Sequence, residues 1–221
     1  QMKVVHTHHG MIGYPTPPPV QYPRFVGVSK GHALMISNRL RIPARYVYNG
    51  IKLPPAGDYK RGNYLLSLNR IAPEKGIHDL IDVAMDTRTP LVIAGDDTHI
   101  SDHKYARDIN KRCVDSNGLV TYLGLVDNGT KEQLLKECLA IVGAPLPDYF
   151  EVFGLYAVEG LAYGKPALVT ANGGLKEIVE HGKSGFICKT PAAMKDVING
   201  KMLDQIRAED CRKRAEVFSR E

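Results

Sequence analysis

The sequence predicts an α/β fold in which a parallel sheet carries helices on both faces. From Asn49 onward, short apolar runs of strand length alternate with longer segments that have helical period. In one of these segments, apolar residues recur at the spacing of a single helix face, namely Ile77, Leu80, Ile81, Ala84 and Met85. Strands that alternate with helices in this way pair in parallel, because each helix carries the chain back across the sheet.

The predicted elements follow one another in a regular order. The apolar runs predicted as strands are residues 63–69, 90–95, 119–124, 139–143 and 166–170. The segments predicted as helices are residues 76–87, 100–113, 130–138, 154–164 and 175–182. In an open sheet of this kind ligands bind beyond the carboxyl ends of the strands, so the loops that follow the strands are expected to carry the chemistry.

The N-terminal part of the chain follows a different pattern. Two short apolar runs, residues 3–7 and 25–28, are predicted as buried strands, and the proline-rich residues 14–23 between them are predicted to form a connecting loop. The chain begins in strand-like sequence and stops inside the helical pattern of RKRAEVFSRE, which suggests a fragment cut at both ends.

Composition limits the classes of function. The 221 residues are 43% hydrophobic and 24% charged, with a net charge of +5. Blocks of lysine and arginine are missing, so a nucleic-acid partner is not expected. The four cysteines lie far apart and form no metal-ligand pattern, which predicts reduced thiols in a cytoplasmic protein. No apolar run reaches the roughly 18 residues that span a bilayer, yet peripheral attachment to the inner face of the membrane stays open.

Two loops at predicted strand ends combine cations and glycines. Arg70 and Lys75 flank a proline-containing turn, and Gly76 then opens a predicted helix. A guanidinium and an ammonium beside a helix N-terminus can clamp a diphosphate, although an isolated pair at this spacing is more often two solvated surface charges. In the other loop, Gly173 and Gly174 permit an αL turn or close approach of the backbone to a ligand.

Two glutamates bracket the start of the fourth predicted helix. Glu151 precedes the helix at the expected mouth of the cleft. Glu159 lies about a turn and a half inside the helix, where a carboxylate can accept hydrogen bonds from a ribose diol. The amides of Phe153, Gly154 and Leu155 are expected to point into the cleft, where the partial positive charge of a helix N-terminus stabilises an anion.

Four segments of the chain, in their order and spacing, resemble one known family. They are NRIAPEKG, AGDD, YLGLV and EVFGLYAVEGLAYGKPALVTANGGLKEIVEHGKSGF. The family is that of the retaining, nucleotide-sugar-dependent glycosyltransferases with the E-x(7)-E motif, glycosyl transferases group 1. The resemblance is close over residues 49 to about 190, and SK at 29–30 and YNGI at 48–51 extend it upstream. The chain departs from the usual pattern at Asn69 and Asp97, where the family commonly has glycine.

The resemblance implies a GT-B architecture of two facing Rossmann-like domains, with the donor held mainly by the C-terminal one. Residues 1–48 would then belong to an incomplete N-terminal, acceptor-side domain and its link, and residues 49–221 would form the donor-binding domain. Neither a cofactor nor a metal ion is implied. Glu151 and His9 would be the catalytic residues, because they would orient the transferred sugar. The substrate-binding residues would be those at the diphosphate (Arg70 and Lys75), the ribose (Glu159), the nucleobase (Val126) and the sugar (Phe153, Gly154 and Leu155).

The segment HTHHG allows two interpretations. His6, His8 and His9 could bind a metal ion as a trio, but a further ligand and supporting acids are not visible in this stretch. The T-x-H-G pattern instead resembles the strand end of the family's N-terminal domain, where a histidine faces the sugar. That position corresponds to His9, and we expect His6 and His8 to be structural.

The function implied by the resemblance is transfer of a hexose from a nucleoside-diphosphate sugar to an acceptor hydroxyl, with retention of anomeric configuration. Two alternatives stay open: an epimerase or phosphorylase of the same GT-B fold, and a nucleotide-sugar-binding fragment without activity of its own. Because the acceptor side looks incomplete, we expect this chain to bind a nucleoside diphosphate but to transfer sugar poorly or not at all. The sequence does not identify the donor base, the sugar, the oligomeric state or the acceptor, whether glycan, lipid or small molecule.

Overall fold

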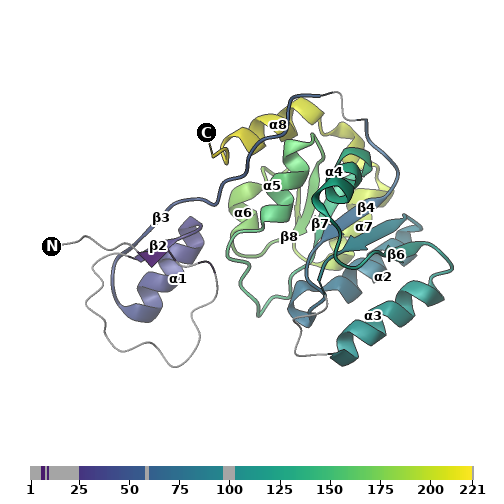
Figure 1. The fold of residues 1–221 in the computed structure, drawn as a ribbon, viewed down its shortest axis with the longest axis horizontal. Coiled ribbons are helices and arrows are strands. Elements are labelled where there is room, and N and C mark those ends of the chain that lie inside the picture. Colours follow the sequence, from purple (N-terminus) through teal and green to yellow (C-terminus); the bar gives the residue numbers. More distant parts are fainter. Residues whose placement is uncertain (1–5, 8, 10–24, 58–59, 97–102, 221) are drawn as a thin grey trace.

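The computed structural model of the chain describes residues 6–7, 9, 25–57, 60–96 and 103–220, and it contains two parallel sheets (Figure 1). The strands of the larger sheet are β4 (Leu65–Leu68), β5 (Leu91–Ala94), β6 (Val120–Tyr122), β7 (Ala140–Gly143), β8 (Ala167–Thr170) and β9 (Gly185–Cys188). They lie side by side in the order β6-β5-β4-β7-β8-β9, and neighbouring strands pair in parallel. The predicted α/β fold with a parallel sheet is therefore confirmed.

Helices cover both faces of the larger sheet (Figure 1). They are the 3-10 helix η1 (Pro73–Lys75), α2 (Ile77–Thr87), α3 (His103–Asp115), α4 (Asn128–Glu137), α5 (Leu155–Ala162), α6 (Leu175–Ile178), α7 (Pro191–Asn199), the 3-10 helix η2 (Met202–Gln205) and α8 (Ala208–Glu216). Helix α2 packs against α3 and α7, and α5 packs against α6 and α8. Every residue of β7 and β8 is buried, as expected for central strands that are covered on both faces.

The chain reverses its direction of winding between β4 and β7, the two strands at the centre of the larger sheet. The connections after β4 lead outward through β5 to β6, and the chain then returns to β7 and continues outward to β9. The loops that leave the carboxyl ends of β4 and β7 therefore diverge. A crevice forms at such a switch point, and it is where open α/β sheets bind their ligands.

The smaller sheet consists of β1 (His6–Thr7), β2 (Phe25–Gly27) and β3 (Ala44–Tyr46), with α1 (Lys30–Leu40) between β2 and β3. The first two strands fall within the predicted runs, although residues 3–5 and the proline-rich loop at 14–23 lie outside the described residues. The sequence analysis did not predict α1, β3, β9 or α7. Helix α1 has only three buried residues, so its sequence carries a weak amphipathic signal.

The expectation that the chain stops inside a helical pattern is wrong. Helix α8 ends at Glu216, and the next residues turn back to the link between the two sheets. Ser219 forms a parallel bridge with Ile51, and the amide of Ile51 donates to the carbonyl of Phe218 at 3.0 Å. The Phe218 ring is buried against Tyr48 and Phe153. Burial of this ring favours the turn over further helix, because it removes a large apolar surface from water.

The carboxylate of Glu177, in α6, joins the two sheets. It accepts hydrogen bonds from the amides of Lys30 and Gly31 at 2.9 and 2.8 Å, and from the Tyr48 hydroxyl at 3.0 Å. Burial and this hydrogen bond raise the pKa of Tyr48 to about 12, so its hydroxyl remains a donor at neutral pH. A carboxylate at the N-terminus of α1 also complements the helix dipole. Glu177 therefore supplies, from the larger part of the molecule, a cap for a helix of the smaller part.

Replacing Glu177 with alanine is expected to expose the first turn of α1. The amides of Lys30 and Gly31 lose their acceptor, so their hydrogen exchange should become about tenfold faster, which corresponds to one net hydrogen bond. Hydrogen exchange measured on the intact chain checks this. The control is Glu180→Ala, because the described partners of the Glu180 carboxylate are Lys183 and Arg214, which lie outside α1. Equal exchange rates in the two variants would contradict the capping role.

The four cysteines are free thiols. Burial raises the pKa of Cys138 and of Cys211 to about 12 and that of Cys188 to about 11, so these thiols stay protonated and unreactive. Within the described ranges, no helix has both the length and the apolar character needed to cross a membrane.

Candidate functional site

A cavity of about 420 Å³ lies at the switch point between β4 and β7. Its described lining comes from the end of β4, from the loop after it, from the loop that precedes α5 and from α5 itself. These residues are Leu68, Asn69, Arg70, Lys75, Glu151, Gly154, Leu155, Tyr156 and Glu159. Six of the residues predicted from the sequence thus lie together, although they are spread over 90 positions of the chain.

The two cations of the β4 loop have different surroundings. The Arg70 side chain is 53% exposed, and its guanidinium lies 3.5 Å from the Glu74 carboxylate. The Lys75 side chain is 11% exposed, and its Nζ lies 2.6 Å from Oε2 of Glu151 and 3.3 Å from the Tyr149 hydroxyl. Lys75 also lies over the Tyr149 ring, 4.6 Å from its centroid. Arg70 is therefore open to an incoming anion, whereas Lys75 already holds a carboxylate.

The sequence analysis placed Glu151 at the mouth of the cleft, but in the structure the residue lies deeper. Its side chain is 8% exposed and forms an ion pair with the Lys75 ammonium. A buried carboxylate needs such a partner, because its desolvation is costly. The ion pair therefore fixes both side chains in the structure.

Asn172 holds the backbone of the loop that carries Glu151. Its Oδ1 accepts from the Glu151 amide at 2.8 Å, and its Nδ2 donates to the carbonyls of Leu146 and Tyr149 at 2.8 and 2.7 Å. The sequence analysis missed Asn172. The signal in the sequence was an asparagine two residues after a predicted strand end, since a side-chain amide can pair with the backbone groups of a neighbouring loop.

The glycines after Asn172 bring two loops together. The Gly174 amide donates to the Glu151 carbonyl at 2.7 Å, and a Cβ atom at Gly173 would lie 2.0 Å from that carbonyl oxygen. The close approach predicted for these glycines is therefore made to the chain's own backbone. Any larger residue at position 173 would push the Glu151 loop away.

The residues at the start of α5 divide between the cavity and the core. Gly154 precedes the helix with a φ of 99°, and it and Leu155 line the cavity. Phe153 does not belong to the described lining, because its ring is buried between Tyr48 and Phe218. The side chain of Phe153 thus anchors the loop in the core.

Glu159 and Val126 were predicted at the nucleoside end of the site. Glu159 lines the cavity, and its Oε1 lies 2.8 Å from the Nζ of Lys131 in α4, a partner that the sequence analysis missed. No pattern in the sequence connects these two residues, which are 28 positions apart. Val126 is half-buried in the loop between β6 and α4 and lies outside the described lining of the cavity.

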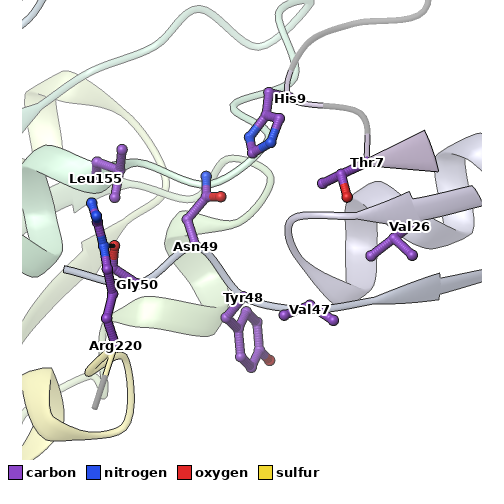
Figure 2. Close-up of a pocket in the computed structure, with 9 residues that line it drawn as sticks. All are labelled: Thr7, His9, Val26, Val47, Tyr48, Asn49, Gly50, Leu155 and Arg220. Carbon is purple, nitrogen blue, oxygen red and sulfur yellow. Dashed lines mark hydrogen bonds between the residues drawn. The ribbon is translucent and has the colours of Figure 1, made fainter. Parts of the chain in front are cut away.

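His9 lines a second cavity, of about 520 Å³, between the two sheets. Figure 2 shows Thr7, Val26 and Val47 on one side of this cavity, Leu155 and Arg220 on the other, and His9 with Asn49 between them. Leu155 also lines the first cavity, so the two cavities adjoin at the start of α5. His9 therefore lines a cavity that residues from both sides of the link between the two sheets also line.

The metal interpretation of the histidines receives no support from the described residues. His8 lies outside them, and the His6 side chain is not described. Within the described part of the chain, no group of three or more His, Cys, Asp or Glu side chains is arranged to hold a metal ion. Asp97 also lies outside the described residues, whereas Asn69 is buried and donates to the Ser67 hydroxyl at 3.3 Å.

Known proteins resemble this chain in sequence and in fold. Residues 53–218 match the family model described as Glycosyl transferases group 1. An uncharacterized glycosyltransferase of Methanocaldococcus jannaschii is 30% identical over 196 residues, which are 86% of this chain and 51% of that protein. A glycogen synthase of Mycobacterium tuberculosis is 34% identical over 162 residues, which are 68% of this chain and 37% of that protein. The chain thus spans about half or less of these curated relatives.

Among solved structures, Anabaena HepE in complex with UDP and glucose has a similar fold. The TM-score is 0.74 at 20% sequence identity, and the match covers 89% of this chain and 59% of the HepE chain. At this level of identity the likeness concerns the fold alone.

Proposed function

Because the chain belongs to the glycosyl transferases group 1 family, we propose that it provides the donor site for transfer of a hexose from a nucleoside-diphosphate sugar to an acceptor hydroxyl, with retention of configuration. The observation that carries the proposal is the single cavity lined by Arg70, Lys75 and Glu159 at the switch point of the sheet. Two cations suit a diphosphate, and a carboxylate suits a ribose diol.

In this proposal, Arg70 and Lys75 neutralise the charge that develops on the leaving diphosphate. Glu151 and His9 orient the sugar from opposite sides, and Gly154 and Leu155 contact it. The Val126 backbone faces the nucleobase, and the Phe153 amide helps to hold the reacting end. The complex of HepE with UDP and glucose supports a uridine nucleotide as the first donor to test.

We further assign residues 49–221 to the C-terminal, donor-binding domain of a GT-B protein with the E-x(7)-E motif. Residues 1–48 are assigned to the acceptor-side domain and the link. The alternating order of strands and helices from β4 onward supports the first assignment, and the separate sheet that contains β1 supports the second. The four free thiols support the cytoplasm as the compartment.

Calorimetric titration of the chain with nucleosides, nucleoside diphosphates and their sugars tests the donor site. We expect a nucleoside diphosphate to bind more tightly than its nucleoside, because the two cations contact the phosphates only. If no nucleoside diphosphate binds at millimolar concentration, the proposal is wrong. Product analysis with and without an acceptor then separates transfer from epimerisation.

A further inference from the structure

The hydroxyl of Tyr156, in the first turn of α5, has no hydrogen-bond partner. Among the described residues, it is the one buried side-chain nitrogen or oxygen atom in this condition. The residue is 6% exposed. Burying a hydroxyl without a partner costs free energy. When such a hydroxyl lies at a ligand site, it is expected to find a hydrogen-bond partner in another state of the protein.

The chain makes room for this hydroxyl at the end of β7. A Cβ atom built at Gly143 would lie 1.9 Å from Oη of Tyr156, so any larger residue at position 143 would displace the ring. Tyr156 lines the same cavity as Lys75 and Glu151. Burial, and next the charges of Glu151 and Tyr149, raise the pKa of Tyr156 well above its usual range. Its hydroxyl therefore stays protonated and can act as a donor.

The acceptor that suits this donor is the Glu151 carboxylate, which the Lys75 ammonium occupies at 2.6 Å. Under the proposed function, the same ammonium binds a diphosphate. If Lys75 simply left, the buried carboxylate would lose its charged partner, and such a loss is strongly unfavourable. A second donor in the same cavity lowers this penalty by about the contribution of one hydrogen bond.

We propose that Tyr156 is a positioning residue that receives Glu151 when a donor diphosphate draws Lys75 away. Its hydroxyl then donates to the carboxylate, and Glu151 stays in the cavity beside the sugar. This inference rests on the proposed function for the identity of the ligand. The exchange of partners itself concerns only residues of this chain.

The first test needs no ligand and uses Tyr156→Phe. Because the hydroxyl has no partner in the free protein, its removal should leave the melting temperature unchanged or raise it. The matched control is Tyr64→Phe, because the Tyr64 hydroxyl donates to the Leu134 carbonyl at 2.9 Å. Loss of that bond should lower the melting temperature by about 2–4 °C. A similar decrease in Tyr156→Phe would overturn the proposal.

A second ligand-free arm removes the competing cation. In Lys75→Met the carboxylate is available to Tyr156, so adding Tyr156→Phe to this background should lower the melting temperature by about 2–4 °C. If the double variant has the same melting temperature as Lys75→Met, the Tyr156 hydroxyl does not donate to the Glu151 carboxylate. This measurement tests the role of Tyr156 even if the chain binds no nucleotide.

The third arm measures affinity for UDP and uridine by calorimetry. Tyr156→Phe should weaken UDP binding about tenfold and leave uridine binding unchanged, because only the diphosphate displaces Lys75. The same loss in a Glu151→Met background, which has no acceptor at this position, would place the hydroxyl on the ligand and overturn the exchange. Absence of UDP binding to the unmodified chain would count against the proposed function, and the two ligand-free arms would still decide the role of Tyr156.

Discussion

Lys75→Met is expected to lower the free energy of unfolding by about 3–5 kcal/mol, because it leaves the buried carboxylate of Glu151 without a charged partner. The same variant should bind a nucleoside diphosphate at least tenfold more weakly, since it also loses a contact to phosphate. Urea denaturation and calorimetric titration measure the two effects separately.

The double variant Lys75→Met, Glu151→Met tests the cause of the instability. Removing both charges eliminates the buried carboxylate, so most of the lost stability should return while nucleotide binding stays weak. Lys111→Met serves as the control, because Lys111 forms an exposed pair with Asp115, and its loss should have no measurable effect. If the double variant is no more stable than Lys75→Met, the ion pair is not the source of the effect.

Arg70→Ala is expected to weaken binding of a nucleoside diphosphate by about ten- to a hundredfold and to spare the nucleoside. The change removes one charge-assisted contact to phosphate, worth about 1.5–3 kcal/mol. Stability should not change measurably, because the side chain is 53% exposed and its pair with Glu74 is long, at 3.5 Å. Arg70 and Lys75 thus differ: one affects binding alone, and the other affects binding and folding.

Two comparisons make the Arg70 result specific. Arg207→Ala removes an exposed arginine that pairs with Asp210 outside the described lining of the cavity, and nucleotide affinity should stay the same. Glu159→Gln should weaken binding of the nucleoside and of the nucleoside diphosphate alike, because the carboxylate that it removes is proposed to contact the ribose. Unchanged diphosphate affinity in Arg70→Ala would show that the clamp is assigned to the wrong residues.

Local pattern predicted the regular part of the fold well. The helix face of Ile77, Leu80 and Ile81 is buried in α2, and the five apolar runs from residue 63 onward contain the strands β4 to β8. These elements carry their own signal, since each buries a periodic apolar face. Helix α1 was missed because part of its stability comes from Glu177, about 150 positions away in the sequence, which no local pattern reveals.

Local sequence pattern also predicted only part of the site. Parallel strand order brings Arg70 and Glu151 to one cavity, and topology makes this predictable. The partners of the predicted residues were not predictable, because Lys75 with Glu151 and Lys131 with Glu159 are tertiary pairs between different loops and helices. The burial of Glu151 follows from Asn172 and Gly174, whose bonds to its backbone depend on the packing of two loops.

The segment from Asn172 to Glu177 has a mechanical consequence. One end holds the backbone of Glu151, and the other end holds the N-terminus of α1 and the Tyr48 hydroxyl. These two sets of contacts are joined by residues 172–177, which include the first three residues of α6. We expect a displacement of the smaller sheet that pulls on Glu177 to reach the loop of Glu151 through this short segment. The two sheets are then expected to move together and not separately.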